Sequence, residues 1–315
     1  MHKDKHCYGF RYICTCQIYN SLLMSATTLS ARSYVVLIIL AVIWGSSFIL
    51  IKKALVAFEP MHLAAMRLVV AGGAFLPILY LQRTKIDWSL WDKYVIVALT
   101  GSGVPAFMFF IAQTEISSSV SGLLNSLTPI WTLLLGVILF KQPFEKWKLG
   151  GVMVGLLGAV ILIIYGNEVG IQGNLWYGGF VLIATVCYGI SVNVVKHYLQ
   201  DVPSLVISSV TLALSGALAL IYLTTTNVYG SFTGTEEMWY SLASLVLLSL
   251  ASTFFATILF YGLVKQTNAV FASSITYLIP IVAFVWGFVD GEALTILHAL
   301  GMILILLGVW IIKKK

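Results

Sequence analysis

Two long apolar stretches of the chain carry polar side chains at helical spacing. In the first stretch these residues step by four, three and four positions, which places them on one face of a helix: Ser121, Asn125, Thr128 and Thr132. In the second stretch the same spacing is followed by Ser273, Tyr277, Pro280 and Phe284, with Thr276 beside them. Such a stripe costs free energy if it faces lipid. Its hydroxyl and amide groups can bind a polar solute. Alternatively, they can form hydrogen bonds to a neighbouring helix, each of which contributes about 0.6 kcal/mol to helix association.

Each stretch is also interrupted near its middle by a proline, Pro129 in the first and Pro280 in the second. Proline has no amide hydrogen, so a carbonyl one turn earlier loses its partner, and inside a bilayer that carbonyl must be satisfied by protein or by a watery cavity. Breaks at corresponding positions of two repeats indicate a transport site near the membrane midplane. We therefore expect a central cavity, with Pro129 and Pro280 as hinges.

Other polar and aromatic side chains are expected to complete this substrate-binding cavity. They lie on the first, third, sixth and eighth apolar segments: Trp44, Ser47, Gln113, Tyr188, Ser191, Phe260 and Tyr261. For any single serine, hydrogen bonding between packed helices is the stronger interpretation. The cavity is favoured for Asn125 and Tyr277, because an amide or a phenol near the midplane needs a partner or water.

Arg67 is the one charged residue expected inside a membrane segment. Because it lies near the outer end of that segment, snorkelling of its guanidinium toward the lipid headgroups is favoured, and binding of a substrate carboxylate is the alternative. All twelve acidic residues lie in the tail, in loops or at segment edges. A carrier driven by protons or sodium usually keeps a carboxylate at the midplane, so we expect any coupling to be weak or indirect.

The sequence offers no catalytic constellation. The apolar segments hold no nucleophile with a base, no paired acids and no histidine cluster, and the chain has no phosphate-binding loop of the Gly-x4-Gly-Lys-Ser/Thr type. Cys7, Cys14 and Cys16 are spaced unlike the usual zinc ligands. We expect no enzymatic activity, no cofactor and no metal site.

The elements that position these residues follow from the composition. Of 315 residues, 60% are hydrophobic and 10% are charged, and the mean hydropathy is +0.97, which is typical of an integral membrane protein. Ten segments are long and apolar enough to span a bilayer as helices: 34–52, 62–81, 93–113, 116–140, 147–165, 174–195, 204–224, 239–263, 268–289 and 293–312. The expected fold is all-α, with ten transmembrane helices.

The two halves of the chain are repeats of each other. An offset of 144 residues aligns Trp44 with Tyr188 and Lys52 with Lys196, and an offset of 151 residues aligns the two prolines. Each half holds five segments, an odd number, so the second half enters the membrane from the opposite side. The sequence therefore predicts inverted repeats, related by an axis in the membrane plane.

These repeats define the domains. Residues 34–165 form the first five-helix repeat, and residues 174–315 form the second, which ends in a basic tail. Residues 1–33 are interpreted as a cytoplasmic tail, or as residues upstream of a true start at Met24.

Lysine and arginine are distributed unevenly between the two sides of the membrane. Fifteen lie on the side of the termini, and Lys52 and Lys53 lie on the other side. This bias predicts a multi-pass protein of the plasma (inner) membrane with both termini in the cytoplasm. It also accounts for the net charge of +6, so no nucleic-acid partner is expected. The expected partners are the lipid bilayer and a small-molecule substrate, and glycines on the fifth and tenth segments provide either close packing or a homodimer surface.

Together these residues resemble a known family. The signals are Trp44-Gly45-Ser46-Ser47-Phe48, Lys52, Pro60, Arg67, Leu127 to Pro129, Leu278 to Pro280 and Gly291-Glu292. Over residues 34–315 the chain resembles an EamA-type member of the drug/metabolite transporter superfamily. It departs from the family at Lys141-Gln142-Pro143, where a Gly-Glu pair is common. The resemblance implies a ten-helix carrier that exports or exchanges small metabolites, often amino acids.

For such a carrier we expect alternating access, in which the two repeats rock about the cavity. Amino acids, similar compounds and drugs are the substrate classes in view. The alternative is a flippase for lipids or lipid-linked sugars on the same fold, which a cavity open to the side would distinguish. A receptor or scaffold is a further alternative, because fold does not fix function.

Overall fold

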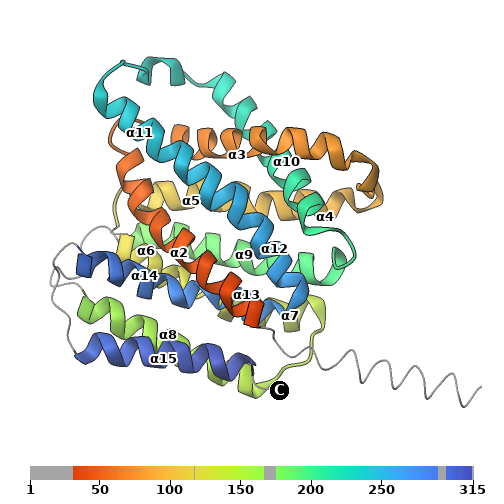
Figure 1. Ribbon diagram of the computed structural model, residues 1–315, viewed down its shortest axis with the longest axis vertical. Coiled ribbons are helices and arrows are strands. Elements are labelled where there is room, and N and C mark those ends of the chain that lie inside the picture. The colour runs from red at the N-terminus through yellow and green to blue at the C-terminus, as the bar shows by residue number, and fades with distance from the viewer. Residues whose placement is uncertain (1–30, 117, 167–174, 290–295, 314–315) are drawn as a thin grey trace, which may run out of the picture.

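The computed structural model describes residues 31–116, 118–166, 175–289 and 296–313, which form a bundle of helices (Figure 1). Residues 1–30 of the expected tail, with Met24, lie outside the described residues, as does the Gly291-Glu292 pair. In chain order the helices are α2 (Ala31–Ala54), α3 (Pro60–Gln82), α4 (Trp91–Ala98), α5 (Val104–Ala112), α6 (Ser118–Asn125), α7 (Thr128–Phe140), α8 (Lys146–Gly166), α9 (Gly178–Tyr198), α10 (Ser204–Thr225), α11 (Glu236–Leu247), α12 (Ala256–Gln266), α13 (Ala269–Ser273), α14 (Ile275–Val289) and α15 (Ile296–Lys313).

Within the described ranges these helices join into ten spans. Six of them are long and apolar enough to cross a membrane by length and composition, and shorter apolar helices accompany them, which confirms the predicted all-α membrane fold. Two spans contain π-helical turns: η3 (Leu99–Gly103) joins α4 to α5, and η6 (Leu248–Phe255) joins α11 to α12. Two others are made of shorter pieces, α6 with α7 and α13 with α14. Large apolar side chains such as Val35, Ile38 and Leu76 are exposed on the bundle, as expected where lipid is the solvent.

The two five-helix repeats are inverted with respect to each other. Corresponding helices run in opposite directions in Figure 1: α2 and α9, α3 and α10, and α8 and α15. The pair α3 and α10 and the pair α8 and α15 pack side by side. Other contacts recur symmetrically, since α2 packs against α12 and α14 just as α9 packs against α5 and α7. The predicted duplication and inversion are therefore confirmed.

Glycines let the helices of each of these two pairs approach closely. A Cβ atom added at Gly72 would lie 2.6 Å from Leu212 O on α10, and one added at Gly158 would lie 2.6 Å from Gly301 O on α15. Both distances are far shorter than a carbon–oxygen van der Waals contact, so only glycine fits. The glycine-rich face of the fifth span therefore packs against the tenth span within the chain, whereas Gly150 has no atom within 4 Å.

The broken spans are interrupted before their prolines. In the fourth span α6 ends at Asn125 and α7 begins at Thr128, so Pro129 lies in the first turn of α7, where its missing amide is tolerated. In the ninth span the interruption is at Ser274, and Pro280 lies inside α14. This corrects the expectation that Pro280 itself breaks the ninth span.

Side chains satisfy the carbonyls that the two prolines leave without an amide partner. Thr128 Oγ1 donates to Asn125 O at 2.7 Å. Ser126 Oγ, from the first repeat, donates to Thr276 O of the second repeat at 3.3 Å. From the sequence, either protein or a watery cavity could satisfy these carbonyls. In the structure, protein hydroxyl groups satisfy them.

The bundle has a termini face, where α2 begins and α15 ends, and a far face, where α2 ends and α3 begins (Figure 1). The largest apolar cluster includes Leu40, Tyr94, Leu199, Ile207 and Phe271. All five lie in the parts of their spans that are close to the termini face. Dense packing therefore closes that half of the molecule.

Candidate functional site

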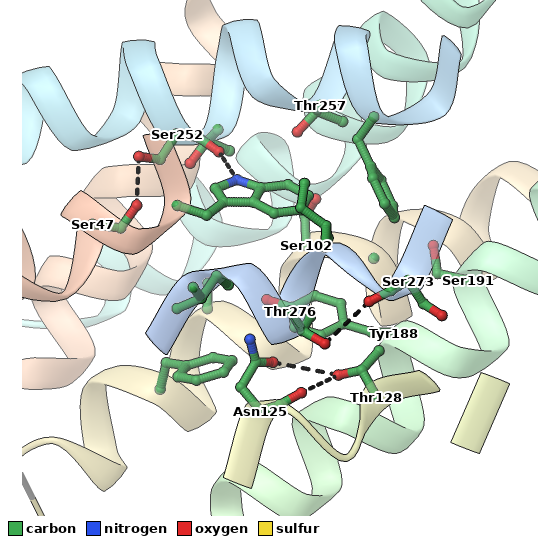
Figure 2. Close-up of a pocket in the computed structure, with 18 of the residues that line it drawn as sticks. Ser47, Ser102, Asn125, Thr128, Tyr188, Ser191, Ser252, Thr257, Ser273 and Thr276 are labelled. Atoms are coloured by element: carbon green, nitrogen blue, oxygen red, sulfur yellow. Dashed lines mark hydrogen bonds between the residues drawn. The ribbon is translucent and has the colours of Figure 1, made fainter. Parts of the chain in front are cut away.

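A cavity of about 120 Å³ lies between the two repeats, next to the interrupted helices (Figure 2). It brings together most of the residues that the sequence predicted for it: Trp44, Ser47, Arg67, Asn125, Thr128, Tyr188, Ser191, Phe260, Tyr261, Ser273 and Thr276. These side chains come from six spans of both repeats, and the third span adds further residues to the lining. The cavity is therefore a shared property of the duplicated fold and not of one repeat.

Among the described residues, four that were predicted to face the cavity do not line it: Gln113, Ser121, Thr132 and Tyr277. Thr132 Oγ1 donates to Thr128 O within α7. Tyr277 is fully buried, and its hydroxyl donates to Val152 O on α8 at 2.9 Å. Its ring lies against Gly155, where an added Cβ would come within 2.9 Å. Ser121 is buried elsewhere on α6, and Gln113 follows the end of α5. The structure thus corrects the expectation for Tyr277, because a helix and not the cavity provides its partner.

Sequence reasoning missed the two π-helical turns, which contribute four residues to the lining. Gly101 and Ser102 come from η3, and Ser252 and Thr253 come from η6. The two turns occupy corresponding positions in the third and eighth spans. π-helical turns are rare and are frequent at functional sites. Small and hydroxylated residues at matching repeat positions were the signal that could have revealed them.

The first span is fastened to the π turn of the eighth. Trp44 Nε1 donates to Ser252 O at 2.9 Å, and Ser47 Oγ lies 2.6 Å from Ser252 Oγ (Figure 2). These bonds hold the indole across the cavity, where its ring meets Phe260 edge-on at 5.1 Å between centroids. Trp44 therefore has a fixed position and forms part of an aromatic wall.

The sixth span meets the π turn of the third in the corresponding way. A Cβ atom added at Gly101 would lie 2.6 Å from Ser191 Oγ and 2.7 Å from Tyr261 Oη. The missing side chain at Gly101 thus makes the space in which these two hydroxyl groups converge. A second aromatic pair, Phe109 and Tyr188, is stacked nearby at 6.2 Å.

Asn125 presents an amide to the cavity at the break in the fourth span. Thr128 Oγ1 bonds its main-chain oxygen and lies 3.4 Å from Oδ1 (Figure 2). Asn125 Nδ2 donates no hydrogen bond to any of the described residues, and Asn125 is 5% exposed. The amide is therefore held from one side and can donate to a solute on the other.

Arg67 lines the cavity as well, and its Nε donates to Thr253 Oγ1 at 2.8 Å. This contact joins the second span to the eighth, inside the bundle. The snorkelling interpretation is therefore wrong for this structure, because the guanidinium points between helices and not toward headgroups. Among the described residues that line the cavity, Arg67 is the only one with a charge.

Comparison with known proteins finds relatives over most of the chain. Residues 31–164 and 175–313 each match the model of the EamA-like transporter family. A protein named "Uncharacterized transporter" from Archaeoglobus fulgidus is 27% identical over 287 residues, which are 90% of this chain and 99% of that protein. A "Probable amino-acid metabolite efflux pump" from Salmonella typhimurium is 24% identical and covers 87% of this chain and 92% of its own.

A third relative is named "S-adenosylmethionine/S-adenosylhomocysteine transporter", from Chlamydia trachomatis serovar L2. It is 23% identical, over 78% of either chain. One crystal structure has the same fold, with a TM-score of 0.69 at 18% identity over 90% of this chain and 96% of its own. Because the family model matches both repeats and so nearly all of the bundle that surrounds the cavity, this chain belongs to the EamA-like transporter family.

Proposed function

We propose that this membrane transporter exports or exchanges amino acids, or small metabolites similar to them, by alternating access through the central cavity. The observation that carries the proposal is a polar-lined cavity enclosed by both inverted repeats beside their helix breaks. The proposed substrate-binding residues are polar and aromatic members of the lining that were expected from the sequence: Trp44, Ser47, Asn125, Thr128, Tyr188, Ser191, Tyr261, Ser273 and Thr276.

The substrate class is supported by two relatives, one named as an amino-acid metabolite efflux pump and one as a transporter of S-adenosylmethionine and S-adenosylhomocysteine. All of these compounds combine a polar amino-acid group with a larger body. The cavity offers both surfaces, since hydroxyl and amide groups alternate with the Trp44–Phe260 and Phe109–Tyr188 aromatic pairs.

Alternating access is supported by a set of lysine contacts at the termini face, which we call the lysine clasp. Lys196, at the end of α9, donates to the main-chain oxygens of Lys265 and Thr267 at the end of α12. Lys265 in turn donates to Val202 O, in the turn after α9. Cations placed on the last carbonyls of a helix stabilise it, so these bonds tie the sixth span to the eighth.

Among the residues that the structure describes, the far face has no corresponding clasp. Lys52 occupies the repeat position of Lys196, is exposed and forms no ion pair among the described residues. When the third and eighth spans are aligned at Ser102 and Ser252, Glu115 takes the place of Lys265, and it too is exposed. The packing of α9 against α12 has no comparable counterpart between α2 and α5. The two repeats have similar structures, but only the termini face is closed by the lysine clasp. One conformation of an alternating-access carrier requires such a difference between its two faces.

The excess of basic residues at the termini face supports a cytoplasmic location of that face in a plasma (inner) membrane protein, so the clasped face is proposed to be the cytoplasmic one. Rocking is accommodated at the interruptions of the fourth and ninth spans, which lie beside Pro129 in the fourth span and at Ser274 in the ninth. Pro280 is a proposed second hinge inside α14. Because no described acidic residue lines the cavity, substrate exchange or a substrate gradient drives transport.

The proposal is tested with full-length protein in proteoliposomes that are loaded with unlabelled amino acids and supplied with the same compounds radiolabelled outside. The panel is first narrowed by growth resistance of expressing cells to toxic amino acids and analogues. We expect exchange of at least one compound, and an Asn125→Leu variant should exchange it about tenfold more slowly, because a hydrogen-bond donor to the solute is lost.

Ser121→Ala is the matched control, since Ser121 lies on the same helix but outside the cavity lining. It should exchange at the rate of the unmodified protein. Exchange by Asn125→Leu at the full rate, with normal yield and monodispersity, would remove the cavity from the transport path.

A further inference from the structure

The charge of the cavity is unbalanced. Arg67 is partly buried among the residues of the cavity, and no carboxylate lies among the described residues that line it. Moving a charged group out of water costs several kcal/mol unless an opposite charge compensates it. In this structure Arg67 has one hydroxyl partner, Thr253, and no ion pair among the described residues. The site is thus incomplete without an anion.

The orientation of Arg67 determines which anion fits. Its Nε is held by Thr253 Oγ1 at 2.8 Å, so one edge of the guanidinium is fixed to the π turn of the eighth span. The terminal nitrogens donate no hydrogen bond to any described residue. Those two nitrogens form the fork that binds both oxygens of a carboxylate at once. Thr253 therefore acts as a positioning residue for Arg67.

The rest of the cavity gives no matching site for a cation. The other charged side chains of the described residues lie outside the lining, which otherwise consists of hydroxyl, amide, aromatic and aliphatic groups. An ammonium group would find hydroxyl oxygens and ring faces there, which are weaker partners than a carboxylate. The aromatic pairs instead suit an apolar or aromatic body.

We propose that the carrier recognises its substrates by a carboxylate bound to Arg67, and that it requires no amino group beside that carboxylate. This inference rests on the proposed function and narrows it: the substrate class is small monocarboxylates with an apolar or aromatic body. Amino acids belong to this class through their carboxylate, and the corresponding 2-oxo acids belong to it equally.

The test is a competition experiment in the proteoliposome exchange assay, with three compounds built on one side chain. L-phenylalanine has both groups, phenylpyruvate keeps the carboxylate but lacks the ammonium, and L-phenylalaninamide keeps the ammonium but lacks the carboxylate. A leucine series provides the aliphatic equivalent. We expect the acid and the 2-oxo acid to compete within a few-fold of each other, and the amide to compete at least about tenfold more weakly.

Variants of Arg67 assign the effect to this residue. Arg67→Gln should weaken competition by the carboxylates about tenfold or more and abolish the preference over the amide, whereas Arg67→Lys should keep part of it. Thr253→Val should weaken competition by the carboxylates less than Arg67→Gln does. Arg83→Gln, an exposed position at the other end of the same span, is the matched control and should leave the preference intact. Thermal stabilisation of the purified protein by each compound, at constant chloride, gives a binding readout that does not require transport.

The outcomes separate the two proposals. If the amide competes as well as the acid, or if Arg67→Gln keeps the full preference, the carboxylate inference is wrong while exchange through the cavity stands. If no compound is exchanged and none stabilises the protein, the proposed function itself fails.

Discussion

At the scale of single residues, the same sequence argument was applied to Asn125 and Tyr277, and the structure places the two side chains differently. Both were assigned to the cavity because a polar side chain near the midplane needs a partner. Asn125 lines the cavity, but Tyr277 reaches Val152 O on α8. Sequence can establish that a partner is required. It cannot say which neighbouring helix supplies one, because that depends on the rotation of the helix within the packed bundle.

Arg67 illustrates the same limit for a charge. Its position near the end of a span favoured snorkelling, and only the packing of the second span against the eighth directs it to Thr253. A residue whose side chain is long enough to reach either lipid headgroups or a cavity cannot be assigned from its place in the sequence.

The new assignment of Tyr277 makes a prediction. Tyr277→Phe removes one hydrogen bond to a main-chain oxygen but keeps the ring that packs on Gly155. The free energy of unfolding should fall by about 0.5–1.5 kcal/mol, and the KM for exchange should stay unchanged. Thermal unfolding in detergent and exchange kinetics measure the two effects. A KM raised several-fold with unaltered stability would return Tyr277 to the binding site.

At the scale of elements, the sequence predicted that the fourth and ninth spans are broken, but it placed one break wrongly. Pro280 lies inside α14 because Ser126 satisfies the carbonyl that it leaves free. A proline tolerated by a hydroxyl from another repeat need not end a helix. The π turns η3 and η6 carry no proline at their centre and were not predicted, since a π turn changes the hydrogen-bond register without changing the apolar pattern of the sequence.

The packing of η3 against α9 gives a prediction at this scale. Gly101→Ala would place a methyl group less than 3 Å from the hydroxyls of Ser191 and Tyr261. Because overpacking of this kind costs about 1–3 kcal/mol, the sixth and third spans must separate or the hydroxyls must move. We expect a lower unfolding temperature and exchange slowed about tenfold, measured by thermal unfolding and in proteoliposomes.

Gly73→Ala serves as the control for this prediction. Gly73 is exposed on α3 and has no atom within 4 Å of an added Cβ, so the same change should leave both measurements nearly unaltered. Equal behaviour of the two variants would mean that the convergence of hydroxyls at Gly101 is unimportant.

At the scale of the whole molecule, the sequence predicted the architecture well. Ten apolar segments and two alignments between the halves were enough for the inverted repeats, because the number of spans in each half fixes their relative direction. Matching residues such as Lys52 and Lys196 also identified equivalent positions. What the sequence could not predict is how the halves differ in one conformation, since equivalent lysines have the same residue type but different contacts.

That difference leads to a prediction about conformational equilibrium. Lys196→Gln weakens the lysine clasp at the termini face, so the cavity should open more often to that face. Lys52→Gln removes the cation that would close the far face on the end of α5 and on Glu115, so the cavity should open more often to the far face. The reporter is Thr257→Cys, which lines the cavity, in a chain whose Cys7, Cys14, Cys16 and Cys187 are replaced.

Labelling by a membrane-impermeant thiol reagent, in vesicles of either orientation, measures access from each face. Access from the termini face should rise in Lys196→Gln and fall in Lys52→Gln, each by a few-fold, because a charged bond to helix carbonyls contributes about 1 kcal/mol to the closed state. Lys53→Gln is the control, since Lys53 lies beside Lys52 but contacts the ring of Tyr240. A double exchange, Lys52→Glu with Glu115→Lys, should restore the access that Lys52→Glu alone disturbs. If both single changes shift access in the same direction, the two lysines do not close opposite faces. The proposal that the lysine clasp and its counterpart at Lys52 control alternating access is then wrong.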